Sequence, residues 1–437
     1  MTPDRTAEPV SMGLVSKMGL IFKRLRQSVM VIFGFNSPDT SPPDEVKLLL
    51  DLQENENVIR DNIRWAAGLF RDSQTEEERN SAYFEMASLL KSVADSDLNS
   101  EIPISLNAKE LRIVLDGLQE KLLVTSGSED ADAREKILQV LCWFSLRTGG
   151  CPQQLSISCH IDCKGKSDYG CGGMNDVLKG TYKGKVIALK HPRAIAMAQP
   201  SRRDALERTF YRYSLVAFNM HNEHVMPVLG VIDDTTIGGF CMVLPWMENG
   251  DLRSYQDRLV SLDKLSGRHF IEKVNGWILA IADGISYLHA FGVVHGDIRG
   301  HNILVDGLGN IRLTAFGSTV IVAADDFTHR GSGSSFAWTA PELIDPQRYN
   351  LKSASPTRAT DTYAFACTCV ELYTLRSPFH GFSDAQVLNR VLQGQRPQRP
   401  DTDGVVLSES LWRFITSCWD ASPSKRPRIS DISSVLQ

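Results

Sequence analysis

The chain has 437 residues, of which 42% are hydrophobic and 23% are charged, and its formal net charge is -5. This length exceeds one ordinary hydrophobic core and predicts at least two domains of a globular protein. The weak acidity gives no basis for nucleic-acid binding. Nine scattered cysteines without a Cys-x-x-Cys pair favour a reducing, cytoplasmic compartment over a disulfide framework.

The first predicted element is a basic amphipathic helix at residues 12–35. Its apolar residues recur at helical spacing, and four cations lie off that stripe: Lys17, Lys23, Arg24 and Arg26. Such a helix can lie in a membrane surface, but the cations leave an uncharged run well short of the roughly 20 residues that span a bilayer. Two interpretations stay open: peripheral membrane contact, or packing of the stripe on the rest of the protein. A Ser- and Pro-rich linker completes this first region, residues 1–43.

The sequence pattern of residues 44–150 predicts a helical region. Its apolar positions recur at helical spacing in four segments: about 44–70, 75–95, 107–125 and 130–147. Asn107 followed by Glu110 is typical of a helix N-terminus, because the Asn side chain can accept a hydrogen bond from the first turn. No motif with chemistry is visible here, and we expect a small bundle that presents or holds the domain that follows.

A group of potential zinc ligands comes next, and its members are Cys151, Cys159, His160, Cys163 and Cys171. Their spacings match no zinc-binding pattern. Leu155, Ile157, Cys159 and Ile161 alternate with polar residues, as on one face of a strand. We therefore interpret the thiols as buried or incidental.

Residues 293–317 carry the clearest chemical motif. Asp297 is followed five residues later by Asn302, and a short hairpin leads to an Ala-Phe-Gly triplet that begins at Ala315. The pattern resembles the catalytic and metal-binding loops of protein kinases, in which His-Arg-Asp and Asn precede Asp-Phe-Gly. The resemblance implies that Asp297 accepts the proton of a substrate hydroxyl and that Asn302 holds a metal ion. Ala315 replaces the usual metal-binding Asp, and its methyl group cannot ligate Mg²⁺.

The other motifs of this family follow in the expected order from residue 152 to 437. Residues 170–177 resemble the glycine-rich loop over the ATP phosphates, and the next strand supplies Lys190, which by resemblance pairs with the α- and β-phosphates. Residues 242–252 resemble the hinge between the lobes, where the Met247 backbone would face the adenine. The residues expected to bind ATP are Gly170, Gly172, Val177, Ala188, Lys190 and Met247. The residues expected to act in catalysis are Asp297, Lys190 and Asn302.

Lys190 is expected to lack its usual partner. Family members hold this lysine with a Glu of the following helix, but here that position falls on Tyr213. The nearest acidic residue upstream, Glu207, is six positions away and about 120° around the helix.

The resemblance implies an α+β, bilobal protein kinase-like fold for residues 152–437, with a small β-rich lobe and a large helical lobe. By the same resemblance, Glu342 and Arg426 form a buried ion pair that braces the activation segment, which ends at Ala340-Pro341-Glu342. Within the family, the segments around Asp297 and Met247 look most like tyrosine-kinase-like Ser/Thr kinases of fungi.

Three functions stay open. The favoured one is a catalytically impaired pseudokinase, a scaffold or allosteric regulator in signalling with weakly bound ATP and an impaired Mg²⁺ site. It is favoured because a lost electrostatic contact in a transfer site typically costs about 3–4 kcal/mol. The second is an active or weakly active Ser/Thr protein kinase that transfers the ATP γ-phosphate to protein hydroxyls. The third is a membrane-acting protein gated by its kinase-like domain. Protein partners or substrates are expected, and the sequence identifies none individually.

Overall fold

The structure, a computed structural model, describes most of the second half of the chain and part of the first. The described residues are 108–124, 149–157, 161, 175–234, 239–314, 336–351, 353–400 and 407–436, with single positions between 134 and 145. All of them lie in one compact unit. The predicted helices at 12–35, 44–70 and 75–95 lie outside the described residues.

An antiparallel sheet forms the small lobe, with the strand order β1-β2-β4-β3 in the described residues. Its strands are β1 (Asn175–Tyr182), β2 (Lys185–Pro192), β3 (Gly230–Asp234) and β4 (Gly239–Pro245). The turn between β1 and β2 holds Lys183 and Gly184 at φ values of 47° and 74°, as a two-residue hairpin turn requires. Because side chains alternate along a strand, β2 buries Ile187 and Leu189 on one face and turns Lys190 to the other.

The buried face of the sheet holds a core that extends to the segment before β1. That core comprises Ile157, Ile161, Ile187, Leu189, Ile232, Cys241 and Val243. The Ile157 N–H donates to the Val231 carbonyl at 2.8 Å, and the Val231 N–H donates to the Leu155 carbonyl at 2.7 Å. The predicted burial of alternate residues is confirmed for Leu155, Ile157 and Ile161. Of the cysteine group, Cys151 is a free thiol, and the other members lie outside the described residues.

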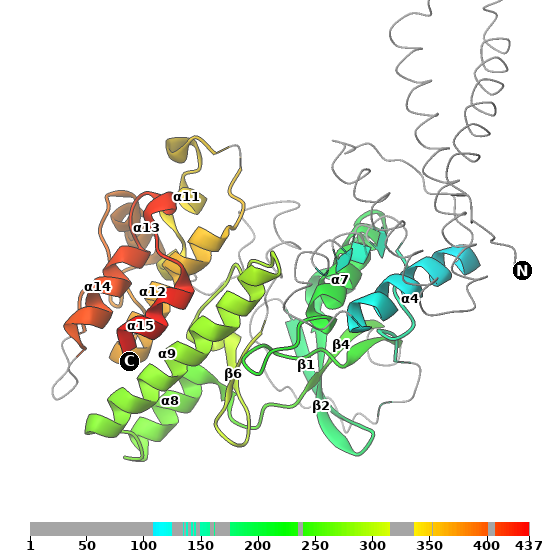
Figure 1. The fold of residues 1–437 in the computed structure, drawn as a ribbon, viewed down its shortest axis with the longest axis horizontal. Helices are drawn as coiled ribbons and strands as arrows, with labels where there is room; N and C mark the ends of the chain where they lie inside the picture. Colours follow the sequence, from blue (N-terminus) through cyan, green and yellow to red (C-terminus); the bar gives the residue numbers. More distant parts are fainter. Residues whose placement is uncertain are drawn as a thin grey trace, which may run out of the picture. The chain divides into compact units, whose positions relative to one another are not determined.

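Helix α7 (Pro200–Phe218) covers the sheet after the short helix α6 (Arg193–Ala196). Pro at the first position of α7 suits a helix start, since that backbone position needs no hydrogen-bond donor. The Phe210 ring packs against Phe240 of β4, with ring centroids 6.3 Å apart. Figure 1 shows α7 and the sheet on the right and the helices of the large lobe on the left.

The large lobe is mainly helical. Its helices are α8 (Leu252–Ser261), α9 (Gly267–Ala290), α11 (Pro341–Ile344), α12 (Arg358–Thr374), α13 (Asp384–Leu392), α14 (Glu409–Cys418) and α15 (Ser433–Leu436). Its strands are β5 (Gly250–Asp251), β6 (Ile303–Val305) and β7 (Ile311–Leu313), in the order β5-β6-β7. Nearly every residue of α12 is buried, so this helix forms the centre of the lobe. The predicted α+β, two-lobed fold is confirmed.

Helix α4 (Ala108–Val124) matches the predicted segment 107–125. Described positions of the next predicted segment are also helical, among them Ile137, Leu141 and Phe144. The domain boundary near residue 150 stays a prediction. In the part of the chain that the structure describes, no helix is long and apolar enough to cross a membrane.

Candidate active site

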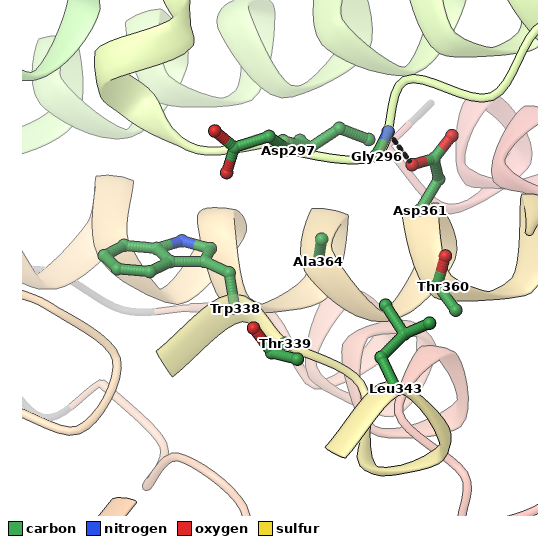
Figure 2. Close-up of a pocket in the computed structure, with 9 residues that line it drawn as sticks. Gly296, Asp297, Trp338, Thr339, Leu343, Thr360, Asp361 and Ala364 are labelled. Atoms are coloured by element: carbon green, nitrogen blue, oxygen red, sulfur yellow. Dashed lines mark hydrogen bonds between the residues drawn. The ribbon is translucent and has the colours of Figure 1, made fainter. Parts of the chain in front are cut away.

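The loop around Asp297 is held by a buried carboxylate of α12. The Asp361 side chain is 1% exposed and accepts hydrogen bonds from the backbone N–H groups of His295 and Gly296, both at 2.8 Å. The Nε2 atom of His289 lies 2.8 Å from the same carboxylate. Figure 2 shows the bond from Gly296 to Asp361. Because buried charge-assisted bonds are short and strong, Asp361 fixes the backbone on which Asp297 sits.

Two further side chains of α12 continue this support. The Thr368 hydroxyl donates to the Ile298 carbonyl at 3.1 Å, and the Gly300 N–H donates to Glu371 Oε2 at 2.9 Å. A Cβ at residue 300 would lie 3.1 Å from Glu371 Oε1, so glycine permits this close approach. Burial raises the pKa of Glu371, although the Gly300 N–H acts in the opposite direction. Three side chains of one helix therefore fix the loop from residue 295 to 300.

Asp297 and Asn302 are in direct contact. The Asn302 Nδ2 group donates to Asp297 Oδ2 at 2.6 Å and to the Asp297 carbonyl at 2.8 Å. The Asn302 carbonyl in turn accepts from the Thr314 N–H at 2.9 Å, which ties the loop to the residue after β7. The structure thus brings two of the predicted catalytic residues together, and the orientation of the amide leaves Asn302 Oδ1 as the atom that a cation could use.

Arg299 is a charged member of the site that the sequence reasoning missed. Its Nε atom lies 3.4 Å from Asp297 Oδ1, and its side chain is 23% exposed. The Nε group is buried and makes no hydrogen bond within the described residues. A basic residue two positions after Asp297 is the only signal that the sequence gives for it, and that signal does not say where the side chain points.

Lys190 lies on the face of the sheet opposite the core, with Val177 of β1 and Met242 of β4 directly across from it. Directly opposed residues of antiparallel strands share a face, so Val177 and Lys190 line the same side. Burial lowers the pKa of Lys190 to about 8, while the Asp297 carboxylate acts to raise it. Among the described residues, Asp297 is therefore the acid whose charge acts on this ammonium.

The acids of α7 have different neighbours. Burial is the main cause that raises the pKa of Glu207, and the charges acting on it belong to Asp204, Arg203 and Asp233. Tyr213 lies in the same uninterrupted helix, and burial raises the pKa of its phenol. The six-residue offset between these positions is thus not removed by a break or bulge in the helix.

Other residues that were predicted to bind ATP also offer groups that fit a nucleotide. Ala188 shares the Lys190 face, because it lies two positions away on the same strand. Met247 is buried, and its carbonyl accepts the Gly250 N–H at 3.2 Å. In the described part of the chain the Met247 N–H donates to no backbone acceptor, so it suits the edge of a base. Gly170 and Gly172 lie outside the described residues.

The residues do not fit an ordinary Mg²⁺ site. Ala315 lies outside the described residues, but an alanine offers no oxygen at any position of its side chain. Asn302 Oδ1 is then the one predicted ligand that remains. The described residues hold no group of three His, Cys, Asp or Glu side chains that suits a metal ion.

A pocket opens beside Asp297. It has about 320 Å³ of space, part of it open to solvent, between the catalytic loop, the segment before α11, and α12. Figure 2 shows the Trp338 indole and Thr339 across the pocket from Asp297. The indole N–H of Trp338 is buried and has no acceptor among the described residues. Asp297 and Trp338 therefore line the same space.

Comparison with known proteins places these features in one family. The family model described as protein tyrosine and serine/threonine kinase matches residues 164–436. The chain is 27% identical over 270 residues to serine/threonine/tyrosine-protein kinase HT1 of Arabidopsis thaliana, a match that covers 62% of this chain and 64% of that protein. It is 28% identical over 279 residues to dual specificity mitogen-activated protein kinase kinase hemipterous of Drosophila melanogaster, covering 62% and 22%.

A further relative is serine/threonine-protein kinase STY46 of Arabidopsis thaliana, 26% identical over 268 residues, which covers 61% of this chain and 42% of that protein. The chain thus spans less than two thirds of the length of each of these relatives. These three come from a plant and a fly, and the resemblance to fungal kinases stays a prediction.

Proposed function

The chain belongs to the protein tyrosine and serine/threonine kinase family, and we propose that it is a catalytically impaired member, a nucleotide-binding scaffold or allosteric regulator in signalling. The observation that carries this proposal is the charge environment of Lys190. Asp297, and not an acid of α7, is the carboxylate that acts on its ammonium in the described residues. Together with Ala315 in place of the metal ligand, this leaves two of the family's usual contacts unmade.

The remaining residues can still hold ATP. Lys190 would face the phosphates, Met247 would offer its N–H to the base, and Val177 and Ala188 would pack on the ring. When bound, ATP would supply the γ-phosphoryl group, and Asp297 would accept the proton of a hydroxyl. Binding is expected to be weak, because Mg²⁺ has few oxygen ligands to bridge the phosphates to the protein.

The expected loss of rate is large. One preorganised electrostatic contact is typically worth about 10²–10³ in rate. The changes at Ala315 and Tyr213 affect two such contacts, although their effects need not add. Phosphoryl transfer, if measured, is therefore expected to be very slow.

The second candidate is an active Ser/Thr protein kinase. The observation that favours it is the ordered catalytic loop, in which Asn302 contacts Asp297 and Asp361 holds the backbone. Arg299 also places a guanidinium beside Asp297, where it can attract phosphate.

A titration of thermal stability with ATP separates the candidates. We expect a small rise in melting temperature that is nearly the same with and without Mg²⁺, since the stabilisation grows with the logarithm of ligand concentration over Kd and a weak ligand adds little. Lys190→Met should abolish this rise, while Lys185→Met, at an exposed position of the same strand, should keep it. A large stabilisation that strictly requires Mg²⁺ would favour the active kinase.

From the sequence alone, we also propose that the protein is cytoplasmic and that its residues 12–35 contact a membrane surface. The third function, a membrane-acting protein gated by the kinase domain, depends on this contact. Flotation of the full chain with vesicles of anionic lipid tests it, compared with a variant in which the four cations are replaced: Lys17→Gln, Lys23→Gln, Arg24→Gln and Arg26→Gln. Membrane contact through these four cations would be excluded if both proteins floated equally or if neither floated.

A further inference from the structure

Helix α4 is joined to the end of α7 by two reciprocal hydrogen bonds. Gln119 Nε2 donates to Asn219 Oδ1 at 2.8 Å, and Asn219 Nδ2 donates to Gln119 Oε1 at 3.0 Å. Both side chains are 0% exposed. Because a buried amide that loses its partner is strongly destabilising, this pair fixes α4 against residue 219. Asn219 is also the residue that ends α7.

A buried arginine strengthens the same junction. Arg134 Nη1 donates to the Leu122 carbonyl at 3.0 Å, and Nη2 donates to the Asn219 carbonyl at 2.9 Å. Its guanidinium carbon lies 5.5 Å from the centre of the Phe291 ring, which follows α9. One guanidinium therefore touches the last turn of α4, the end of α7 and the large lobe. We name Gln119 and Arg134 together with Asn219 the α4 clamp.

The residues after Asn219 connect the small lobe to the large one. The His221 N–H donates to the Tyr287 hydroxyl of α9 at 2.8 Å. The Met226 N–H donates to the Leu313 carbonyl of β7 at 2.8 Å. The α4 clamp thus acts at the point where α7 meets the large lobe, and a change there can alter how the lobes face each other.

Helix α4 is itself packed firmly. The Gln153 N–H donates to Asp116 Oδ1 at 2.6 Å. A Cβ at Gly150 would lie 3.0 Å from side-chain atoms of both Leu111 and Leu115, so the following segment approaches α4 closely. This packing gives the clamp a fixed support from which to hold residue 219.

We propose that the α4 clamp sets the position of α7 against the large lobe and so controls the affinity of the cleft for nucleotide. A shift at this junction would reach the catalytic loop, because the Met226 N–H donates to the Leu313 carbonyl at 2.8 Å and the N–H of the next residue, Thr314, donates to the Asn302 carbonyl at 2.9 Å. A protein partner that draws α4 away from residue 219 would then change nucleotide binding, and nucleotide would change the affinity for that partner by the same factor. The effect on nucleotide affinity rests on the proposed function, whereas the effect of the clamp on the position of α7 does not.

The test uses amide hydrogen exchange and ATP affinity of the full chain. In Gln119→Ala we expect exchange at 215–226 to rise about tenfold, because the end of α7 loses its fixed point. ATP affinity should fall about fivefold, since a smaller fraction of molecules has an ordered cleft. Adding Asn219→Ala should raise exchange further, because Asn219 Nδ2 also donates to the Leu215 carbonyl of α7 at 2.9 Å. The matched control is Leu123→Ala, at a residue of the same helix that is 47% exposed, which should leave both quantities unchanged.

A second variant covers the case in which Gln119→Ala does not fold. Arg134→Lys keeps the positive charge but cannot reach both carbonyls with a planar fork, so it should raise exchange at 215–226 in the same way. Increased exchange confined to 108–124, with parent values at 215–226 and for ATP, would overturn the proposal. If the parent bound no ATP, the nucleotide-binding part of the proposed function would fail, while the exchange data would still decide whether the clamp holds α7.

Discussion

Glu342 and Arg426 form a buried, two-point ion pair. Arg426 Nη1 lies 2.6 Å from Glu342 Oε1, and Nη2 lies 2.8 Å from Glu342 Oε2. The two side chains are 2% and 0% exposed, respectively. Arg426 Nη1 also donates to the Ala359 carbonyl at 2.8 Å, which links α11 to the first turn of α12. The pair predicted by resemblance is therefore confirmed.

Arg426→Ala should lower the free energy of unfolding by about 3–5 kcal/mol, because it leaves the Glu342 carboxylate buried without its partner. Urea titration measures the loss. The matched control is Arg399→Ala, since the pair of Arg399 with Glu409 is largely exposed, at 41% and 56%, and should contribute much less to stability. Equal losses in the two variants would contradict the role given to the buried pair.

The pair of His301 and Asp251 predicts a pH-dependent stability. The hydrogen bond from the His301 ring to Asp251, at 3.1 Å, raises the pKa of His301. Burial acts to raise the pKa of Asp251, but hydrogen bonds from His301 and Ser254 outweigh it and lower that pKa. The histidine contribution is thus complete below its ordinary pKa of 6.5 and is lost as pH rises through the raised value. The aspartate contribution is lost at acidic pH.

His301→Gln should therefore destabilise the protein more at pH 5.5 than at pH 8.5. Because His301 is more than half exposed, we expect a difference of at most about 1 kcal/mol. Thermal unfolding of both proteins at the two pH values measures it. A larger effect at the higher pH would show that the assigned direction is wrong.

The lowered pKa of Lys190 predicts how ATP affinity depends on pH. The pKa of about 8 in the folded protein lies below the ordinary 10.5, so the ammonium loses its charge above pH 8 and attracts phosphate less. The ATP affinity of the parent should fall between pH 7 and 9.5, by at most about tenfold for each pH unit. Isothermal titration calorimetry tests this, and Lys185→Met, which keeps Lys190, should show the same fall. A parent affinity that stays constant over this range would contradict the lowered pKa.

Restoring the family's acids should raise activity. If the residues at 315 and 213 limit phosphoryl transfer, Ala315→Asp combined with Tyr213→Glu should increase the rate above that of the parent, by about 10² or more. Transfer from labelled ATP to a generic protein substrate measures this. The matched control is Leu308→Asp, at an exposed residue of the hairpin between β6 and β7, which should leave the rate unchanged. Activity of the double variant at the parent level would mean that other residues limit the reaction.

Much of the fold was predictable because its determinants are local. The order of the motifs predicted the strand that carries Lys190, and apolar residues at helical spacing in segment 107–125 predicted α4 to within one residue at each end. Asp297 and Asn302 were both predicted as site residues, and their contact follows because only four residues of one loop lie between them.

The remaining features depend on groups that are distant in sequence. Gln119 and Asn219 are 100 residues apart, and an amide pair leaves no pattern in either segment. The position of Arg299 depends on the path of the loop, which is set by the contacts of Asp361 and Glu371 from α12. The pKa of Lys190 depends on how many atoms surround the ammonium, which only the packed structure determines.

The most direct measurement of impaired catalysis compares phosphoryl transfer by the parent and by Asp297→Asn under single-turnover conditions with ATP and Mg²⁺. The Asn variant keeps the size of the side chain but cannot accept the proton of a hydroxyl. We predict that both proteins transfer phosphate at the same very low rate. A clear parent activity that Asp297→Asn abolishes would contradict the account and would identify the protein as a working kinase.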